Sequence, residues 1–154
     1  MQDVREVFGL TPRHEASQHR VVVRSKAAWE LLKNFGAGKS KSWWIADPIL
    51  TADDAIVTAW IKAFFDDEAH FVPNGGIRVR SVNRPGLEQV AIMLRRFIPC
   101  HLTPTRGLYP DDSCYLVVLK THRPTFLRLI GSSKAPETAT LMILTESGSR
   151  GIVM

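Results

Sequence analysis

The sequence predicts an α+β fold in which helices and β-hairpins alternate in the order α-β-β-α-β-β-α. Three segments with helical spacing of apolar residues are separated by two hairpin signals, and this alternation supports the prediction. A chain of 154 residues with 45% hydrophobic content is long enough to bury one good core. We therefore expect an N-terminal arm over residues 1–17 and a single domain over 18–154. Within the domain, residues 18–50 form a strand-helix lead-in and residues 51–154 form the core.

The lead-in follows an arm that has no sustained periodicity. Residues 20–24 contain three consecutive valines, which favour a strand. Ser25 is a favourable N-cap for a helix that reaches about Phe35, and Gly36 is suited to end it. The inward face of this helix is expected to consist of Ala28, Trp29, Leu31, Leu32 and Phe35.

A basic loop with the sequence Gly-Lys-Ser-Lys-Ser follows at residues 38–42. Its glycine spacing differs from that of a phosphate-cradling loop, so the loop does not predict a nucleotide site. If Lys39 and Lys41 contact a nucleic acid, we expect them to touch phosphates.

The core begins with a helix that starts at Thr51, carries Asp53 and Asp54 in its first turn, and runs to about Asp66. Alanine recurs every four residues along it, which gives a stripe of small side chains beside larger apolar ones. Such a stripe would let another helix approach closely, although ordinary core packing produces the same spacing. The stripe consists of Ala55, Ala59 and Ala63.

The first hairpin turns at residues 73–76, which read Pro-Asn-Gly-Gly. The strand that follows, over 77–82, alternates between apolar and basic residues. Period-2 alternation places Arg78 and Arg80 on one face, where they either contact a ligand or simply face solvent.

The rest of the core is a helix, a second hairpin and a final helix. Pro85 opens the helix, which extends to about Phe97, and the hairpin strands are expected near 101–106 and 115–120. Pro124 starts the last helix. The inward residues of the helix opened by Pro85 are Leu87, Val90, Leu94 and Phe97.

Three consecutive acids, Asp66, Asp67 and Glu68, lie at the end of the helix that starts at Thr51. The helix dipole places negative charge on the last carbonyls, so each exposed carboxylate there is unfavourable by roughly 0.3–1 kcal/mol. A hard divalent cation accepts carboxylate and carbonyl oxygens as ligands and would convert this end into a binding site. The alternative to a cation site is a run of acids that is simply solvated by water.

The order of residues around these acids resembles the LAGLIDADG motif of homing endonucleases, whose nine positions fall on residues 61–69. Trp60 before the motif and the His70-Phe71 pair after it are also similar to the family. Asp67 stands where a small residue is usual and Ala69 replaces the usual glycine, as in archaeal-type members. The resemblance implies an αββαββα homing-endonuclease-like fold with a DNA-binding antiparallel sheet and the motif helix at a two-fold dimer interface.

The resemblance also implies site residues. Glu68 takes the place of the family's catalytic, metal-binding acid, with Asp67 as a weaker metal ligand that faces the partner subunit and Asp66 closing the helix end. Lys134 follows a helix that ends near Ile130-Gly131, as the family's basic residue near the scissile phosphate does, although a lone lysine there is also an ordinary surface charge. The implied metal is Mg²⁺, for which Ca²⁺ or Mn²⁺ can substitute.

One acidic motif per chain implies a homodimer, because cutting both strands of a duplex requires two symmetry-related sites. The implied interface residues are Ala55, Ala59, Ala63, Phe64 and Asp67. The net charge of +5 and the pI of 9.6 favour a polyanionic partner, which the resemblance identifies as double-stranded DNA. The basic groups expected to contact DNA are Arg78 and Arg80, then Arg106, Lys120 and His122, and then Lys39 and Lys41.

The function implied is that of a free-standing, intron-encoded enzyme: a site-specific double-strand DNA endonuclease that cleaves a long pseudo-palindromic site across the minor groove and promotes intron homing. The alternative is a non-cleaving nucleic-acid-binding module on the same scaffold, either an RNA maturase or a transcription regulator. The sequence has no apolar run long enough to span a bilayer and no signal pattern, so we expect a cytoplasmic protein without a membrane partner. Cys100 and Cys114 do not suggest zinc, and no small-molecule cofactor beyond the metal is expected.

Overall fold

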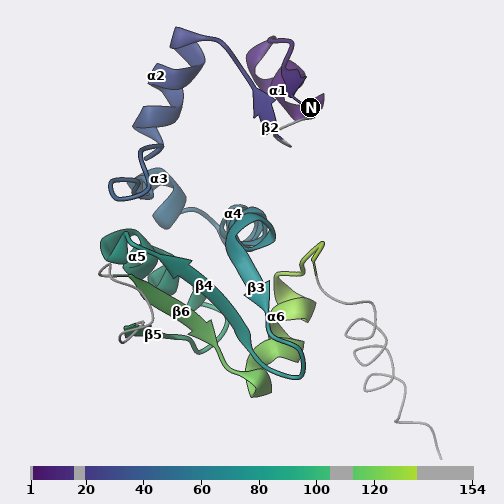
Figure 1. Ribbon diagram of the computed structural model, residues 1–154, viewed down its shortest axis with the longest axis vertical. Helices are drawn as coiled ribbons and strands as arrows, with labels where there is room; N and C mark the ends of the chain where they lie inside the picture. Colours follow the sequence, from purple (N-terminus) through teal and green to yellow (C-terminus); the bar gives the residue numbers. More distant parts are fainter. Residues whose placement is uncertain (1, 16–19, 105–112, 135–154) are drawn as a thin grey trace, which may run out of the picture.

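The computed structural model describes residues 2–15, 20–104 and 113–134 (Figure 1). From α4 onward the elements follow the predicted α-β-β-α-β-β-α order, with one 3-10 turn before the last helix. None of the described helices is long and apolar enough to cross a membrane. The elements are α1 (Gln2–Phe8), β1 (Arg13–Glu15), β2 (Arg20–Val22), α2 (Lys26–Asn34), α3 (Asp47–Leu50), α4 (Asp54–Glu68), β3 (Ala69–Phe71), β4 (Ile77–Ser81), α5 (Arg84–Leu94), β5 (His101–Pro104), β6 (Cys114–Val118), η2 (Lys120–His122) and α6 (Arg123–Leu129).

A four-stranded antiparallel sheet in the order β3-β4-β6-β5 forms one layer of the fold. β4 and β6 are the central strands, paired from Ile77 opposite Val118 to Ser81 opposite Cys114. Each predicted hairpin forms an outer pair of strands, β3-β4 and β5-β6. Both hairpins are therefore confirmed, and the loop of the second lies outside the described residues.

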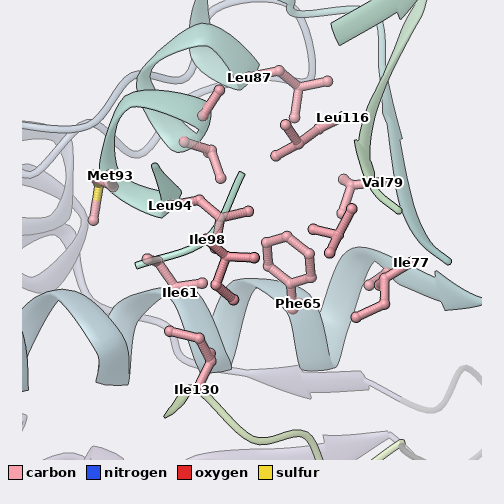
Figure 2. Packing of buried hydrophobic residues seen from close by; sticks show 14 of the residues in the cluster. Ile61, Phe65, Ile77, Val79, Leu87, Met93, Leu94, Ile98, Leu116 and Ile130 are labelled. Carbon is pink, nitrogen blue, oxygen red and sulfur yellow. The ribbon is translucent and has the colours of Figure 1, made fainter. Parts of the chain in front are cut away.

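The helices α4, α5 and α6 pack on one face of this sheet. In Figure 2, Ile61 and Phe65 project from α4 toward the sheet residues Ile77, Val79 and Leu116. Fully burying one such side chain stabilises the fold by roughly 1.5–3 kcal/mol, so this layer fixes the orientation of α4 firmly. The buried residues of α4 are Val57, Ile61 and Phe65, which leaves the alanine stripe on a different side of the helix.

Capping residues mark the starts of α4 and α5. The side chain of Asp53 accepts a hydrogen bond from the Ile56 amide (3.0 Å), and the side chain of Asn83 accepts one from Gly86 (3.2 Å). α5 ends at Leu94, earlier than the predicted Phe97, which is half-buried beyond the helix. The other predicted inward residues, Leu87, Val90 and Leu94, are fully buried.

α4 extends to Glu68, two residues beyond the predicted end at Asp66. Ala69 is its C-cap and is already extended, with φ −82° and ψ 144°, so the helix passes into β3 without a loop. Two cations stabilise the last turn: Lys62 pairs with Asp66 four residues further along the helix, and Lys134, which only the tertiary structure places, reaches the Asp67 carbonyl. All three acids therefore belong to the helix.

The N-terminal part lies apart from the sheet layer, to which α2 and α3 connect it (Figure 1). The predicted arm contains α1 and β1, and β1 pairs with β2 as a two-stranded antiparallel sheet. Ser25 caps α2 as expected, accepting from Ala28 N at 3.2 Å. The expected inward face of α2 is wrong for all but Ala28, because the large side chains are 42–48% exposed at Trp29, Leu31, Leu32 and Phe35.

The segment after α2 is attached to the N-terminal end of α5. Gly36 has φ +96°, and a β-carbon there would meet the Trp44 carbonyl oxygen, so glycine is required where the chain turns. Gln89 binds both backbone groups of Ile45, accepting from N at 2.8 Å and donating to O at 3.2 Å. This attachment brings the basic loop beside α4 and the sheet.

Candidate active site and nucleic-acid interface

The acids of α4 lie at the border between the helix layer and the sheet. Because Ala69 pairs with Val79, Glu68 stands at the level of Arg80 on the neighbouring strand. Asp67, Glu68 and Arg80 line one cavity of about 810 Å³. The cavity is also lined by residues of the basic loop and by the aromatic residues Phe35, Trp43, Trp44, Trp60 and Phe64.

The three acids have different surroundings. The Asp66 side chain is 17% exposed, and its carboxylate accepts hydrogen bonds from Lys62 Nζ (2.7 Å), Ser132 Oγ (2.7 Å) and Ser133 N (2.8 Å). Asp67 and Glu68 are exposed, and within the described part of the chain neither carboxylate has a hydrogen bond or an ion pair. Asp66 thus closes the helix end as predicted, while two carboxylates stay available to a ligand.

The charge of Asp66 is stabilised by these contacts. Partial burial raises the pKa of its carboxyl group, but the hydrogen bonds from Lys62, Ser132 and Ser133 outweigh burial and hold that pKa well below its usual range. Asp66 is therefore ionised throughout the neutral range and remains an acceptor for all three donors.

Lys134 lies next to the acids. Its Nζ donates to the Asp67 carbonyl oxygen at 2.7 Å, and its backbone N–H donates to Ser132 Oγ at 3.1 Å. A cation at this position also offsets the negative end of the α4 dipole. The two residues are 67 positions apart in the sequence, and the close approach of their segments follows from the packing of α6 on α4.

The residues present fit a divalent metal as part of a larger ligand set. Mg²⁺ is typically held by one or two carboxylates together with waters and phosphate oxygens, and Glu68 and Asp67 offer free carboxylates. Among the described residues, no three His, Cys, Asp or Glu side chains come together to hold a metal ion. Cys100 and Cys114 are free thiols, and burial raises the pKa of both.

The sheet face opposite the helices carries polar side chains, and we call it the open face. Strand register sets its residues in two rows, because directly opposed residues share a face. One row is His70, Arg78, Val117 and His101, and the other is Arg80, Tyr115 and Thr103.

Arg78 and Arg80 differ in how they are held on the open face. Arg78 is exposed, and no described group binds its guanidinium. Arg80 is exposed as well, but its Nε donates to Ser113 Oγ at 3.2 Å. The predicted alternation is confirmed, since the neighbours Ile77 and Val79 are fully buried.

Sequence reasoning missed His70, His101, Tyr115 and Thr103 as members of the open face. The register of the first hairpin could have placed His70 opposite Arg78. No local signal pairs β4 with β6, so placing the residues of the second hairpin, His101, Thr103 and Tyr115, on the same face as Arg78 required the three-dimensional structure.

The other predicted DNA-contacting residues are scattered. Lys120 and His122 lie in η2, beyond the Val118 end of β6 and so at the end of the sheet away from Glu68. Lys39 and Lys41 are exposed on the loop that borders the cavity. Arg106 lies outside the described residues.

The alanine stripe is on the surface. Ala55, Ala59 and Ala63 are all exposed, and Ile56 beside them is 54% exposed. Phe64, also expected at the interface, is half-buried because it stacks on Trp60, with ring centroids 5.3 Å apart. The alanine stripe is therefore exposed in the single chain, whereas Phe64 is partly covered by its own chain.

Solved structures of the homing endonuclease I-DmoI are similar to this chain in fold. Its mesophilic variants match with a TM-score of 0.66 and 17% identity, covering 92% of this chain and 72% of theirs. I-DmoI in complex with DNA and Mn matches with a TM-score of 0.61 and 16% identity, covering 88% of this chain and 72% of that one. A substituted I-DmoI bound to its target DNA in the presence of Mg matches with a TM-score of 0.60 and 15% identity, covering 84% of this chain and 68% of that one. Neither a protein-family model nor a curated protein matches the sequence.

Proposed function

We propose that this protein is a site-specific, metal-dependent DNA endonuclease of the LAGLIDADG homing type. One observation carries the proposal: on a homing-endonuclease fold, the free Glu68 carboxylate ends the motif helix beside the arginine-bearing open face of the sheet. An exposed carboxylate that is not engaged by the described residues and lies next to a cationic surface is suited to hold a metal against a phosphate.

In the proposed complex the open face lies in the major groove of DNA. With strands about 4.8 Å apart, a row of four residues spans about 14 Å, close to the groove width of about 12 Å. Arg78 donates to guanine O6 and N7, and Arg80 lies nearer the cleavage site. The basic loop, with Lys39 and Lys41, contacts phosphates on the same side.

Glu68 and Asp67 would hold Mg²⁺, and the I-DmoI complexes with DNA that contain Mn or were formed with Mg support a divalent metal here. When bound, such a metal makes water a stronger nucleophile at neutral pH and stabilises charge on the phosphate. The Lys134 ammonium binds the carbonyl oxygen of Asp67, the residue before Glu68. From there it stabilises the negative charge that develops on the scissile phosphate.

Cutting both strands requires two such sites, and we propose a homodimer in which the α4 helices cross along the alanine stripe. The exposed Ala59 and Ala63 support this arrangement, because small side chains let two helix backbones approach closely. The symmetric dimer would read a long pseudo-palindromic site. An intron-encoded origin remains part of this proposal.

The test is cleavage of a plasmid library with randomised inserts in the presence of Mg²⁺, followed by sequencing of the linearised molecules. The recovered target is then cut with the parent and with Glu68→Gln. We expect Glu68→Gln to lower the cleavage rate at least about 100-fold, because loss of groups that only orient metal ligands reaches that size. Binding should persist.

Glu88→Gln is the matched control, since Glu88 is an exposed acid on α5 that pairs with Arg84 at 3.0 Å. It should cut at the parental rate. If Glu68→Gln cuts as fast as the parent, the proposed role of Glu68 is rejected. If the parent binds a selected site without cutting it under any divalent metal, the non-cleaving module is the better description.

A further inference from the structure

The end of α4 is joined to the segment after α6 by a connected set of hydrogen bonds, which we call the Asp66 network. Asp66 Oδ1 accepts from Ser132 Oγ and from Ser133 N, while its Oδ2 accepts from Lys62 Nζ. Two of these three donors, Ser132 Oγ and Ser133 N, hold residues 132–133 firmly, because hydrogen bonds to an ionised group are about twice as strong as neutral ones.

The network continues from Ser132 to Lys134. The Ser132 hydroxyl oxygen accepts from the Lys134 N–H at 3.1 Å, and the Lys134 ammonium then reaches the Asp67 carbonyl at 2.7 Å. Hydrogen bonds thus lead from Asp66 to Lys134 and back to the next residue of α4. The Lys134 side chain is held over the last turn of α4, next to Glu68.

The approach to the network is also fixed. Phe126 and Ile130 of the α6 region are buried, and the Phe126 ring lies 4.8 Å from the Phe65 ring of α4. Gly131 has φ +78°, a conformation that glycine adopts without strain, and this lets the chain turn toward Asp66. The segment is therefore positioned by the core on one side and by Asp66 on the other.

We propose that Asp66 is a positioning residue that acts through Lys134, holding its ammonium beside Glu68 where the scissile phosphate binds. The inference rests on the proposed endonuclease function and deepens it by assigning a role to the acid that does not bind metal. Asp66 would have to give up the network to become a ligand, whereas Asp67 and Glu68 carry free carboxylates.

The first experiment is a double-substitution cycle on single-turnover cleavage with Asp66→Ala, Lys134→Ala and the pair. We expect each single change to slow cleavage by roughly 10–100-fold, the range seen when orienting groups are removed. The pair should be no slower than Lys134→Ala alone, because Asp66 acts only through Lys134. Additive losses in the pair, or a Lys134→Ala variant that cuts at the parental rate, would overturn the inference.

Two further variants separate positioning from a general effect on folding. Asp66→Asn keeps an oxygen acceptor for Ser132 and Ser133, so it should recover most of the rate that Asp66→Ala loses. Ser132→Ala breaks the link to Lys134 while leaving Asp66 paired with Lys62, and it should behave like Asp66→Ala. An Asn variant as slow as the Ala variant, with Ser132→Ala at the parental rate, contradicts the proposed route.

The second experiment requires neither DNA nor metal. Amide hydrogen exchange at Ser133 and Lys134 should be faster in Asp66→Ala than in the parent, and exchange in the core strand β4 should be unchanged. Unchanged exchange at both amides overturns the inference whether or not the chain cuts DNA. Faster exchange in a protein that never cuts DNA would reject only the endonuclease function and support the positioning of Lys134.

Discussion

The acid end of α4 and the open face of the sheet meet at the Glu68–Ala69 boundary, yet they are built in opposite ways. At the helix end, acids and lysines are joined by hydrogen bonds that come from segments 66 and 67 residues away in the sequence. On the open face, Arg78 and its neighbours His70 and His101 project from a rigid strand ladder. The first region holds Asp66 and Lys134 in a network, whereas the second presents Arg78 to solvent.

This difference suggests that chemistry and recognition are separable in this protein. Groups that take part in catalysis must be held in place before the substrate arrives, because misplacement lowers the rate steeply. Groups that read DNA can reorganise on binding, provided that a stiff scaffold sets their spacing. Substitutions at the helix end should therefore change the cleavage rate with little effect on affinity, and substitutions on the open face should do the reverse.

The largest effect on binding and cleavage is expected from Ala63→Leu on the alanine stripe, because loss of the dimer would disturb both regions at once. A larger side chain at a close helix crossing is unfavourable by roughly 1–3 kcal/mol, and a symmetric dimer carries it twice. We expect a monomer in analytical ultracentrifugation that neither binds the full site tightly nor cuts both strands.

Because Ala63 is exposed in the single chain, thermal unfolding of the Ala63→Leu monomer should change little. Ala27→Leu, on the exposed surface of α2, is the control and should leave the dimer intact. A fully dimeric Ala63→Leu variant would show that the stripe is not the interface.

The next effect concerns recognition alone. Arg78→Ala should weaken binding to the selected site by about 1–3 kcal/mol, the range for one bidentate arginine-guanine pair. Single-turnover cleavage at saturating protein should be nearly unchanged. Arg78→Lys keeps the charge but loses the bidentate geometry, so it should relax sequence preference more than it lowers affinity.

Arg128→Ala is the matched control for Arg78, because Arg128 is an exposed arginine on α6, away from the open face. It should bind the site as the parent does. Loss of the cleavage rate without loss of affinity in Arg78→Ala would contradict the division of roles between the two regions.

A smaller effect is expected from the basic loop. Replacing Lys39 and Lys41 by alanine should weaken binding to all sequences alike and flatten the dependence of log K on log salt by about 1 for each lysine that contacts a phosphate. Fluorescence anisotropy across salt concentrations measures both quantities. Lys33→Ala, which removes a lysine paired with Glu30, should leave the slope unchanged, and equal slopes in all proteins would exclude phosphate contacts by the loop.

The smallest effect is a pH dependence of stability from Asp66, measured with a chelator present. Its folded-state pKa is lowered, so its stabilising contribution is complete above the unfolded pKa of about 3.9 and is lost as the pH falls toward the folded pKa. Asp66→Asn should be less stable than the parent by about 1–3 kcal/mol at neutral pH, and the gap should narrow below about pH 4. A gap that stays constant down to acid pH would show that ionised Asp66 does not hold the network.

Several features of the fold and site were predictable because they depend on local sequence. The cap Ser25, the alternation around Arg78, and the turn between β3 and β4 each arise from neighbouring residues and are confirmed. The predicted helix start at Thr51 is wrong, because Thr51 ends the short helix α3 and Asp53 caps α4 instead. The acid order at 66–68 also placed Glu68 at the end of a helix. These predictions hold because backbone preferences and the alternation of side chains along a strand are set by residues only a few positions apart.

α2 shows where local reasoning failed. Its apolar spacing predicts a buried face, but spacing indicates only that a face is apolar and not that another element covers it. Trp29, Leu31, Leu32 and Phe35 remain 42–48% exposed. The position of Lys134 is the opposite case, since a resemblance suggested its role but only the packing of α6 on α4 brings it to Asp67.

The sequence by itself determined the elements from α4 onward, their order and the acids at the end of the motif helix, since these follow from periods and turns. The tertiary structure decided which acid is engaged and which are free, which histidines join the arginines on the open face, and which apolar helix face stays uncovered. Those outcomes depend on contacts between residues far apart in the chain. Such contacts are set by how whole layers pack, so no local pattern specifies them.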